Sequence, residues 1–323
     1  MLDYQLIVDL LLKKDNYLIL IHRNPDGDAI GSAEALRILL LALGKKAEIL
    51  SYDPAPAYLR FLPEKPFFSA ENGILPADRT YISVDVAEEK LFGFHPDSIP
   101  GGVYLKIDHH KTGNDFAAYN FVDAAASAAG EIVYLLGKKA AIKDPSFHRA
   151  CYAAIASDTG CFRYSNATAE TFSIASELIC NGVDTKALNA SLFENKNRLM
   201  VKANAVGILS ASFHFDGRAA LLTFTNEMCQ KEGFQSEHLA ELSSVLREIE
   251  GVELSVVLKE KKDAPGSYRI SARSKHYFDC TTLCAAFSGG GHARAAGGDI
   301  CAPSAQEAER QILREIGRQM SNP

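Results

Sequence analysis

Residues 17–44 read YLILIHRNPDGDAIGSAEALRILLLALG and decide the fold class of the first half of the chain. The run 17–21 is short, apolar and rich in isoleucine and leucine, which is typical of a strand buried on both faces of a parallel sheet. A polar turn follows, and residues 30–43 then carry the pattern of a helix that ends at Gly44. The stretch therefore predicts a strand–turn–helix unit of an α/β fold.

The same alternation continues over the first 190 residues. Strands that alternate with helices indicate a parallel sheet with helices on both faces. Ligands of such sheets bind beyond the carboxyl ends of the strands. The other elements predicted here are buried strands at 47–50, 81–84 and 103–107 and helices at 130–136, 147–156, 169–180 and 185–192.

Beyond residue 190 the pattern changes to that of a smaller α+β domain. Residues 195–209 predict a long connecting helix, and 211–215 and 219–224 predict a hairpin with Asp216-Gly217 as its turn. We therefore expect a first domain at 1–190, a linker helix at 191–210 and a second domain at 211–323, with a cleft between the domains. The remaining predicted elements are helices at 238–248, 281–287 and 305–320 and strands at 252–258 and 268–272.

The bulk composition constrains the compartment and the partners. Hydrophobic residues make up 47% of the chain and charged residues 23%, so two ordinary cores can form. No apolar run approaches the ~20 residues of a membrane helix, and the N-terminus lacks the basic start of a secretory signal. Seven cysteines without a CxxC pair predict reduced thiols and a cytoplasmic location. The net charge of −6 argues against a track for long nucleic acid.

Polar clusters stand at the ends of several predicted elements. Taken singly, each has an ordinary structural explanation, since an aspartate commonly caps a helix, ends a strand or forms a turn. Taken together, they bring at least four aspartates and two histidines to one edge of a parallel sheet. The members are His22, Asp26 and Asp28 in the segment 22–28, Asp85 after the strand 81–84, Asp108, His109 and His110 after the strand 103–107, and Asp158 after the helix 147–156.

Such a set of side chains predicts bound metal ions. Carboxylates held close together repel one another unless cations neutralise them. A mixture of carboxylate and imidazole ligands suits manganese or a related transition metal better than calcium. Two such ions ~3.5–4 Å apart are a common device for displacement at phosphorus. The clusters therefore indicate a two-metal site that hydrolyses phosphate esters.

The same segments resemble the motifs of a known family. The runs HRNPDGDAIGS at 22–32, VD at 84–85, IDHH at 107–110 and SDTG at 157–160 resemble the four motifs of the DHH phosphoesterases. The run GGGHARAAGG at 289–298 resembles the glycine-rich motif of the DHH-associated substrate domain. The resemblance is closest to the branch that degrades nanoRNA and also dephosphorylates 3′-phosphoadenosine 5′-phosphate (pAp). It implies a catalytic first domain and a substrate-binding second domain.

The resemblance also implies roles for individual residues. His22 and Asp26 would hold one metal ion, Asp28, His109 and Asp158 would hold the second, and Asp85 would bridge both. The ions would be two Mn²⁺, with Co²⁺ or Mg²⁺ as alternatives, and a bridging water would be the nucleophile. His110 would stabilise the reacting phosphate or donate a proton, and Asp108 would orient its neighbours. The substrate-binding residues implied are Arg273, Ser274, Gly289, Gly290, Gly291 and His292, with Phe162, Arg163 and Asn166 as further candidates to line the base or phosphate site.

The expected function is thus a manganese-dependent phosphoesterase that hydrolyses nanoRNA to mononucleotides and dephosphorylates pAp. Its partners would be short RNA oligonucleotides and small nucleotides, with no membrane, and a homodimer is a candidate assembly. Three alternatives stay open. They are a cyclic- or linear-dinucleotide phosphodiesterase, an inorganic polyphosphate or pyrophosphate hydrolase, and a nucleotide sensor without turnover. A turnover assay with manganese separates the sensor from the enzymes.

Overall fold

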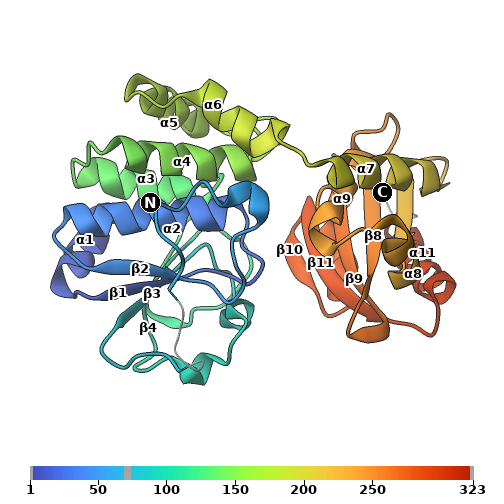
Figure 1. The fold of residues 1–323 in the computed structure, drawn as a ribbon, viewed down its shortest axis with the longest axis horizontal. Helices are drawn as coiled ribbons and strands as arrows, with labels where there is room; N and C mark the ends of the chain where they lie inside the picture. The colour runs from blue at the N-terminus through green and yellow to red at the C-terminus, as the bar shows by residue number, and fades with distance from the viewer. Residues whose placement is uncertain (1–2, 69–73, 321–323) are drawn as a thin grey trace. The chain divides into compact units, whose positions relative to one another are not determined.

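The computed structural model describes residues 3–68 and 74–320 and divides into two compact units, Met1–Asn195 and Lys196–Pro323. Each unit has its own sheet (Figure 1), and buried apolar side chains pack against both faces of each sheet. The predicted fold class is confirmed, because the first unit is a parallel α/β structure and the second combines a mixed sheet with helices. No helix in the described ranges is long and apolar enough to cross a membrane.

The first unit is built on a five-stranded sheet in which every neighbouring pair is parallel. Its strands, in spatial order, are β2 (Ala47–Leu50), β1 (Tyr17–Leu20), β3 (Thr80–Val84), β4 (Val103–Asp108) and β5 (Ala117–Val122). All four residues of β1 are buried, as its unbroken apolar run predicted. The edge strand β5 was not predicted, because its partly exposed residues AAYNFV lack a buried strand's apolar run.

The α-helices of this unit pack on one face of the sheet, and short 3-10 helices with their loops cover the other (Figure 1). The parallel sheet is therefore as predicted, but the prediction of helices on both faces is corrected, because the second face is covered by loops and 3-10 turns instead of α-helices. A Cβ at Gly31 of α2 would lie 2.8 Å from the carbonyl oxygen of Ala150 in α4, so glycine permits the close approach of these two helices. The helices are α1 (Tyr4–Lys13), α2 (Gly27–Ala42), α3 (Ala129–Lys139), α4 (Pro145–Asp158), α5 (Ala169–Cys180) and α6 (Thr185–Asn189), with 3-10 turns at Ala57–Leu59, Glu89–Phe92 and Pro96–Ser98 and a π-turn at Ala190–Glu194.

The second unit contains a six-stranded sheet with apolar cores on both faces. Helices α10 and α11 cover one face, and α7 and α9 contribute to the core on the other. Among the strand pairs that the structure describes in this sheet, β7–β8 is parallel and the others are antiparallel. In spatial order the strands are β10 (Gly290–His292), β11 (Ala295–Cys301), β9 (Ala264–Ser274), β8 (Leu254–Lys261), β7 (Ala219–Phe224) and β6 (Ser212–His214), and the helices are α7 (Arg198–Ser210), α8 (Asn226–Glu232), α9 (Leu242–Arg247), α10 (Cys280–Ala285) and α11 (Ala305–Met320).

Two local predictions for the second unit differ from the structure. The single helix predicted at 238–248 is wrong, because the chain forms a 3-10 turn, Ser236–Leu239, followed by the short helix α9. The glycine-rich run forms the hairpin β10–β11, which its composition did not predict because glycine is usually depleted from strands. Gly291 has a φ of 139°, and a Cβ at Gly289 would collide with the carbonyl oxygen of Gly297. Glycine is therefore required by the hairpin itself.

Candidate metal centre

The loop between β1 and α2 carries the first cluster. Asp26 accepts hydrogen bonds from the backbone N–H groups of Asp28 and Ala29, so Asp26, rather than Asp28, caps α2. The buried carboxylate of Asp28 accepts from the N–H groups of Ala129 at 2.8 Å and Gly130 at 3.1 Å. These two residues begin α3, whose N-cap position has no side-chain cap of its own. Both carboxylates therefore lie at helix N-termini, where the helix dipole favours negative charge.

Asp85 follows β3 and lies between two imidazoles. Its φ of 58° falls in the left-handed region, which aspartate and asparagine tolerate better than most residues. Its Oδ2 is 3.7 Å from Nε2 of His22, and its Oδ1 is 3.4 Å from Nε2 of His109. The side chain is 4% exposed, and Oδ1 accepts no hydrogen bond from the residues that the structure describes. A buried carboxylate oxygen in this state is suited to a cation.

The six expected ligand residues come together as two sets. The ligand atoms of His22, Asp26 and Asp85 lie within 4.8 Å of one another, as do those of Asp28, His109 and Asp158. Asp85 connects the sets, because it also faces His109. Asp158 joins the second set as the last residue of α4, which packs closely on α2.

Burial, and then the charges of neighbouring groups, shift the pKa values of the side chains in this cluster. Burial, and then the charge of Asp85, raise the pKa of Asp28 well above its ordinary value. Burial raises the pKa of Asp158 to about 7, opposed by His109 and reinforced by the charges of Asp26 and Asp85. Burial opposes protonation of His22, but its hydrogen bond to Asp26 and the nearby carboxylates raise its pKa to about 10. Divalent cations would relieve the same repulsion.

Asp108 contacts both His110 and the buried Lys106. Asp108 Oδ1 accepts from the backbone N–H of His109 at 2.9 Å and lies 2.7 Å from Nδ1 of His110. Its Oδ2 is 3.2 Å from Nζ of Lys106, which also donates to the carbonyl oxygens of Ala87 and Asn114. Asp108 thus fixes the orientation of the His110 ring, and Lys106 holds Asp108 in place.

Three further side chains contact the predicted site residues and hold them in place. Sequence reasoning missed Lys106, although a lysine two residues before Asp108 in an apolar strand must share its face. It also missed Ser32, whose hydroxyl donates to Asp28 Oδ1 at 2.7 Å. Asn166, considered only for the substrate site, donates from Nδ2 to the backbone oxygen of Asp158 at 3.2 Å and to its Oδ2 at 3.3 Å. These contacts orient two of the expected ligands.

The expected substrate residues of the second unit lie around the β10–β11 hairpin. In the register of the sheet, His292 pairs with Ala295, and Ala295 pairs with Arg273, so these three residues form one row across three strands. Arg273 is half-buried and donates to the carbonyl oxygen of Ala272. Ser274 is 1% exposed and donates to the carbonyl oxygen of Phe278 at 2.7 Å, which is a structural contact.

Comparisons with known proteins identify the family of the chain. The model described as "DHH family, N-terminal domain" matches residues 16–157, and the DHHA1 domain matches residues 219–322. The chain is 30% identical over 311 residues to the bifunctional oligoribonuclease and PAP phosphatase NrnA of Thermus thermophilus, an alignment that covers 93% of this chain and 89% of that protein. The chain belongs to the DHH family. It is a hydrolase that acts on phosphate esters.

Solved structures of low identity share the DHH-family fold. An exopolyphosphatase-related protein from Bacteroides fragilis superposes with a TM-score of 0.87 at 22% identity and covers 98% of this chain and 95% of its own. RecJ from Thermus thermophilus in complex with Mn²⁺ has a TM-score of 0.55 at 14% identity and covers 99% of this chain and 55% of its own.

Proposed function

We propose that this DHH-family hydrolase degrades very short RNA oligonucleotides to mononucleotides and dephosphorylates pAp, with two manganese ions as cofactors. One observation carries the proposal, which is that the two ligand sets meet at the buried carboxylate of Asp85. The choice of substrate is supported by the similarity, over most of its length, to a relative named for both activities.

The residues of the two sets fit a pair of divalent cations. His22 and Asp26 would hold one ion, Asp28, His109 and Asp158 the other, and Asp85 both. The Oδ1 of Asp85, which accepts no hydrogen bond from the described residues, and the pKa of Asp28, raised by burial and by the charge of Asp85, support this assignment, because both are expected of buried carboxylates that a metal ion would neutralise. The mixture of oxygen and imidazole ligands favours manganese or cobalt over magnesium. When bound, such ions supply an activated water and neutralise charge on the phosphate.

The protein's own side chains would supply orientation and proton transfer. His110, held by Asp108 through Nδ1, would contact the reacting phosphate or donate a proton to the leaving oxygen. Asp108 is kept ionised although burial opposes it, because its hydrogen bond with His110 and the charge of Lys106 hold its pKa below the ordinary value. In the second unit, Arg273 and His292 would hold a phosphate that does not react.

The rate per RNA end is expected to fall steeply beyond a few nucleotides. The chain carries a net charge of −6, so a long RNA has little general electrostatic attraction to it. The measurement is manganese-dependent turnover on a length series from dinucleotides to forty-mers at equal concentrations of ends. Equal rates at both extremes would rule out a preference for nanoRNA.

Arg273→Ala and His292→Ala are expected to separate recognition from chemistry. Each should lose on the order of 10-fold or more in kcat/KM on a dinucleotide, as expected for one charge-assisted contact. Each should lose little on bis-(p-nitrophenyl) phosphate, which has no second phosphate to hold. The exposed Arg310→Ala is the matched control. If kcat/KM falls equally on both substrates, these residues support the fold or the metal site instead.

A further inference from the structure

One face of the second sheet carries three cationic side chains from two neighbouring strands. Lys259 of β8 is the register partner of Arg269 of β9. Arg273 lies four residues further along β9 and shares the face of Arg269, because side chains alternate along a strand. The opposite face holds Leu258 and Ile270, which are fully buried in the core. We call Lys259, Arg269 and Arg273 the basic face.

Two of these cations have no protein counter-ion. Across the described residues, neither Nζ of Lys259 nor the guanidinium of Arg269 takes part in a hydrogen bond or ion pair. Asp299, the register partner of Arg269 on β11, is already engaged, since its Oδ1 lies 2.9 Å from Nζ of Lys261. The acid next to Lys259 along β8, Glu260, points to the opposite side of the sheet.

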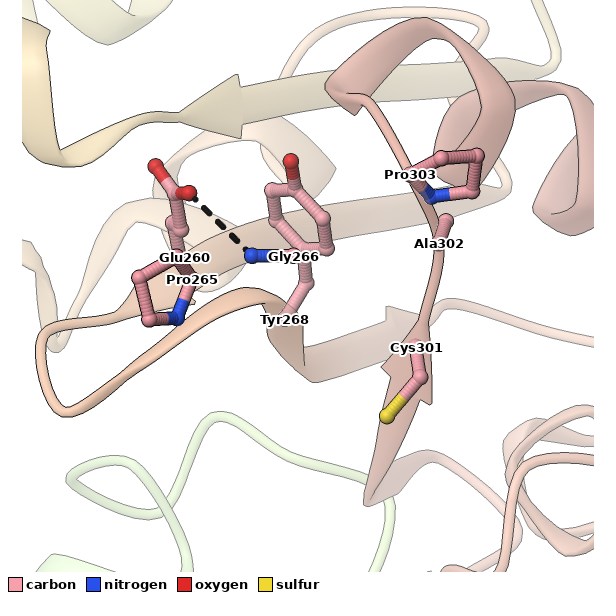
Figure 2. Close-up of a pocket in the computed structure, with 7 residues that line it drawn as sticks. All are labelled: Glu260, Pro265, Gly266, Tyr268, Cys301, Ala302 and Pro303. Carbon is pink, nitrogen blue, oxygen red and sulfur yellow. Dashed lines mark hydrogen bonds between the residues drawn. The ribbon is translucent and has the colours of Figure 1, made fainter.

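The charges of β8 are thus sorted between the two sides of the sheet. Glu260 borders an open cavity of about 590 Å³, lined also by Tyr268 and the segment 301–303, and accepts there from the backbone N–H of Gly266 at 3.5 Å (Figure 2). It also accepts from the backbone N–H of Asn226 at 2.8 Å. Its carboxylate is therefore used for local backbone contacts and leaves the basic face positive.

This arrangement is unfavourable without an anion. Burial and the neighbouring guanidinium groups of Arg269 and Arg273 lower the pKa of Lys259 to about 8. Cations that share a surface without a counter-ion reduce the free energy of unfolding, because each disfavours the charged form of the others. A bound polyanion would reverse this effect, since a ligand that binds only the folded state stabilises it.

The shape of the surface suits an extended ligand. Arg269 and Arg273 are separated by four strand residues, or ~13 Å at the usual rise of a strand. Ser271 lies between them, and Gly297 and Ala295 are the partners of Ser271 and Arg273 on β11. The side chains between the two guanidinium groups along this face are thus small. One phosphate cannot bridge that distance, so the face suits successive phosphates of one chain.

We propose that the basic face binds backbone phosphates of an RNA oligonucleotide beyond the phosphate at Arg273, and that Lys259 and Arg269 thereby set the affinity for substrates longer than a dinucleotide. The inference rests on the proposed function. A planar guanidinium can contact a phosphate through two N–H groups, whereas a lysine acts as a point charge. Contacts to phosphate groups do not distinguish one base from another, so this binding would be independent of the RNA sequence.

The test is the double variant Lys259→Gln/Arg269→Gln with a dinucleotide and a pentanucleotide RNA, assayed with manganese at several salt concentrations. The variant should lose at least ~10-fold in kcat/KM on the pentanucleotide and keep its rate on the dinucleotide. The salt dependence of KM for the pentanucleotide should weaken by ~0.7 in logarithmic slope per lost phosphate contact. The control Lys262→Gln/Arg310→Gln removes the same charge from exposed positions and should leave kcat/KM unchanged on both RNAs.

A binding measurement separates this inference from the proposed function. The metal-free double variant should bind a fluorescent pentauridylate more weakly than the metal-free wild type does. Its melting temperature should be unchanged or higher, because two mutually repelling charges are gone. Equal losses on both RNA lengths, or unchanged pentanucleotide binding, would overturn the role of the basic face while leaving an active enzyme. Wild-type protein that hydrolyses neither RNA would overturn the proposed function, and this inference with it.

Discussion

An Asp85→Asn variant is expected to lose at least ~100-fold of turnover while remaining folded, a loss on the scale found when one preorganised polar group is removed from an active site. Asp85 belongs to the set of His22 and also faces His109, so its loss should affect both sets. Asparagine keeps the shape and tolerates the φ of 58°, whereas alanine would add backbone strain. The substitution therefore removes charge with little change of structure.

Manganese stoichiometry and thermal unfolding check this expectation. The variant should bind fewer than two ions, and its metal-free form should unfold at a temperature no lower than that of the metal-free wild type, because one repelling charge is gone. Asp97→Asn, at a side chain that is 92% exposed, is the matched control and should keep full activity. Retention of more than a tenth of wild-type turnover would disprove the bridging role.

Removal of metal is expected to abolish turnover and to lower stability, and manganese or cobalt should restore both better than magnesium. Ligands that bind only the folded state stabilise it by ~2.7 kcal/mol per site at a concentration of 100 Kd. The measurement is activity and melting temperature after chelation and readdition of each ion at equal concentration. Full recovery with magnesium alone would contradict the site with imidazole ligands described above.

The metal-free protein should also lose stability as the pH rises from about 5 to 8. Burial raises the folded-state pKa of Asp158 from 3.8 to about 7, so the folded state binds more protons than the unfolded state across this range. Stability then falls as the pH rises through the folded pKa. The raised pKa of His22 likewise makes the stability of the folded state fall as the pH rises. The measurement is the free energy of unfolding in urea at both pH values, with chelator and with manganese. Stability should fall with rising pH only in the metal-free protein.

Most of the fold was predictable where local pattern and burial agree. The strand β1 is an unbroken apolar run, and α11 has the residues 305–320 expected from its amphipathic pattern. The prediction was incomplete where tertiary contacts decide the conformation. β5 became a strand through pairing with β4, and the glycine-rich run became β10 and β11 through pairing along the edge of the second sheet.

The candidate site was predictable for a topological reason. His22, Asp85 and His109 follow β1, β3 and β4, and the parallel order of these strands brings their carboxyl ends to one edge. The supporting contacts were harder to foresee, because they depend on side-chain positions. Asn166 reaches Asp158 from the segment that follows α4, and the side-chain contact depends on how that segment folds back.

The most direct test of the central claim is a comparison of manganese-dependent rates on RNA dinucleotides and pentanucleotides, pAp, cyclic di-AMP and pyrophosphate. All substrates should be present at equal concentration, with the Asp85→Asn variant as the inactive control. We expect rapid hydrolysis of both RNAs and of pAp, and slow hydrolysis of cyclic di-AMP and pyrophosphate. Fastest turnover of pyrophosphate or cyclic di-AMP, or no turnover of either RNA or pAp, would contradict this expectation.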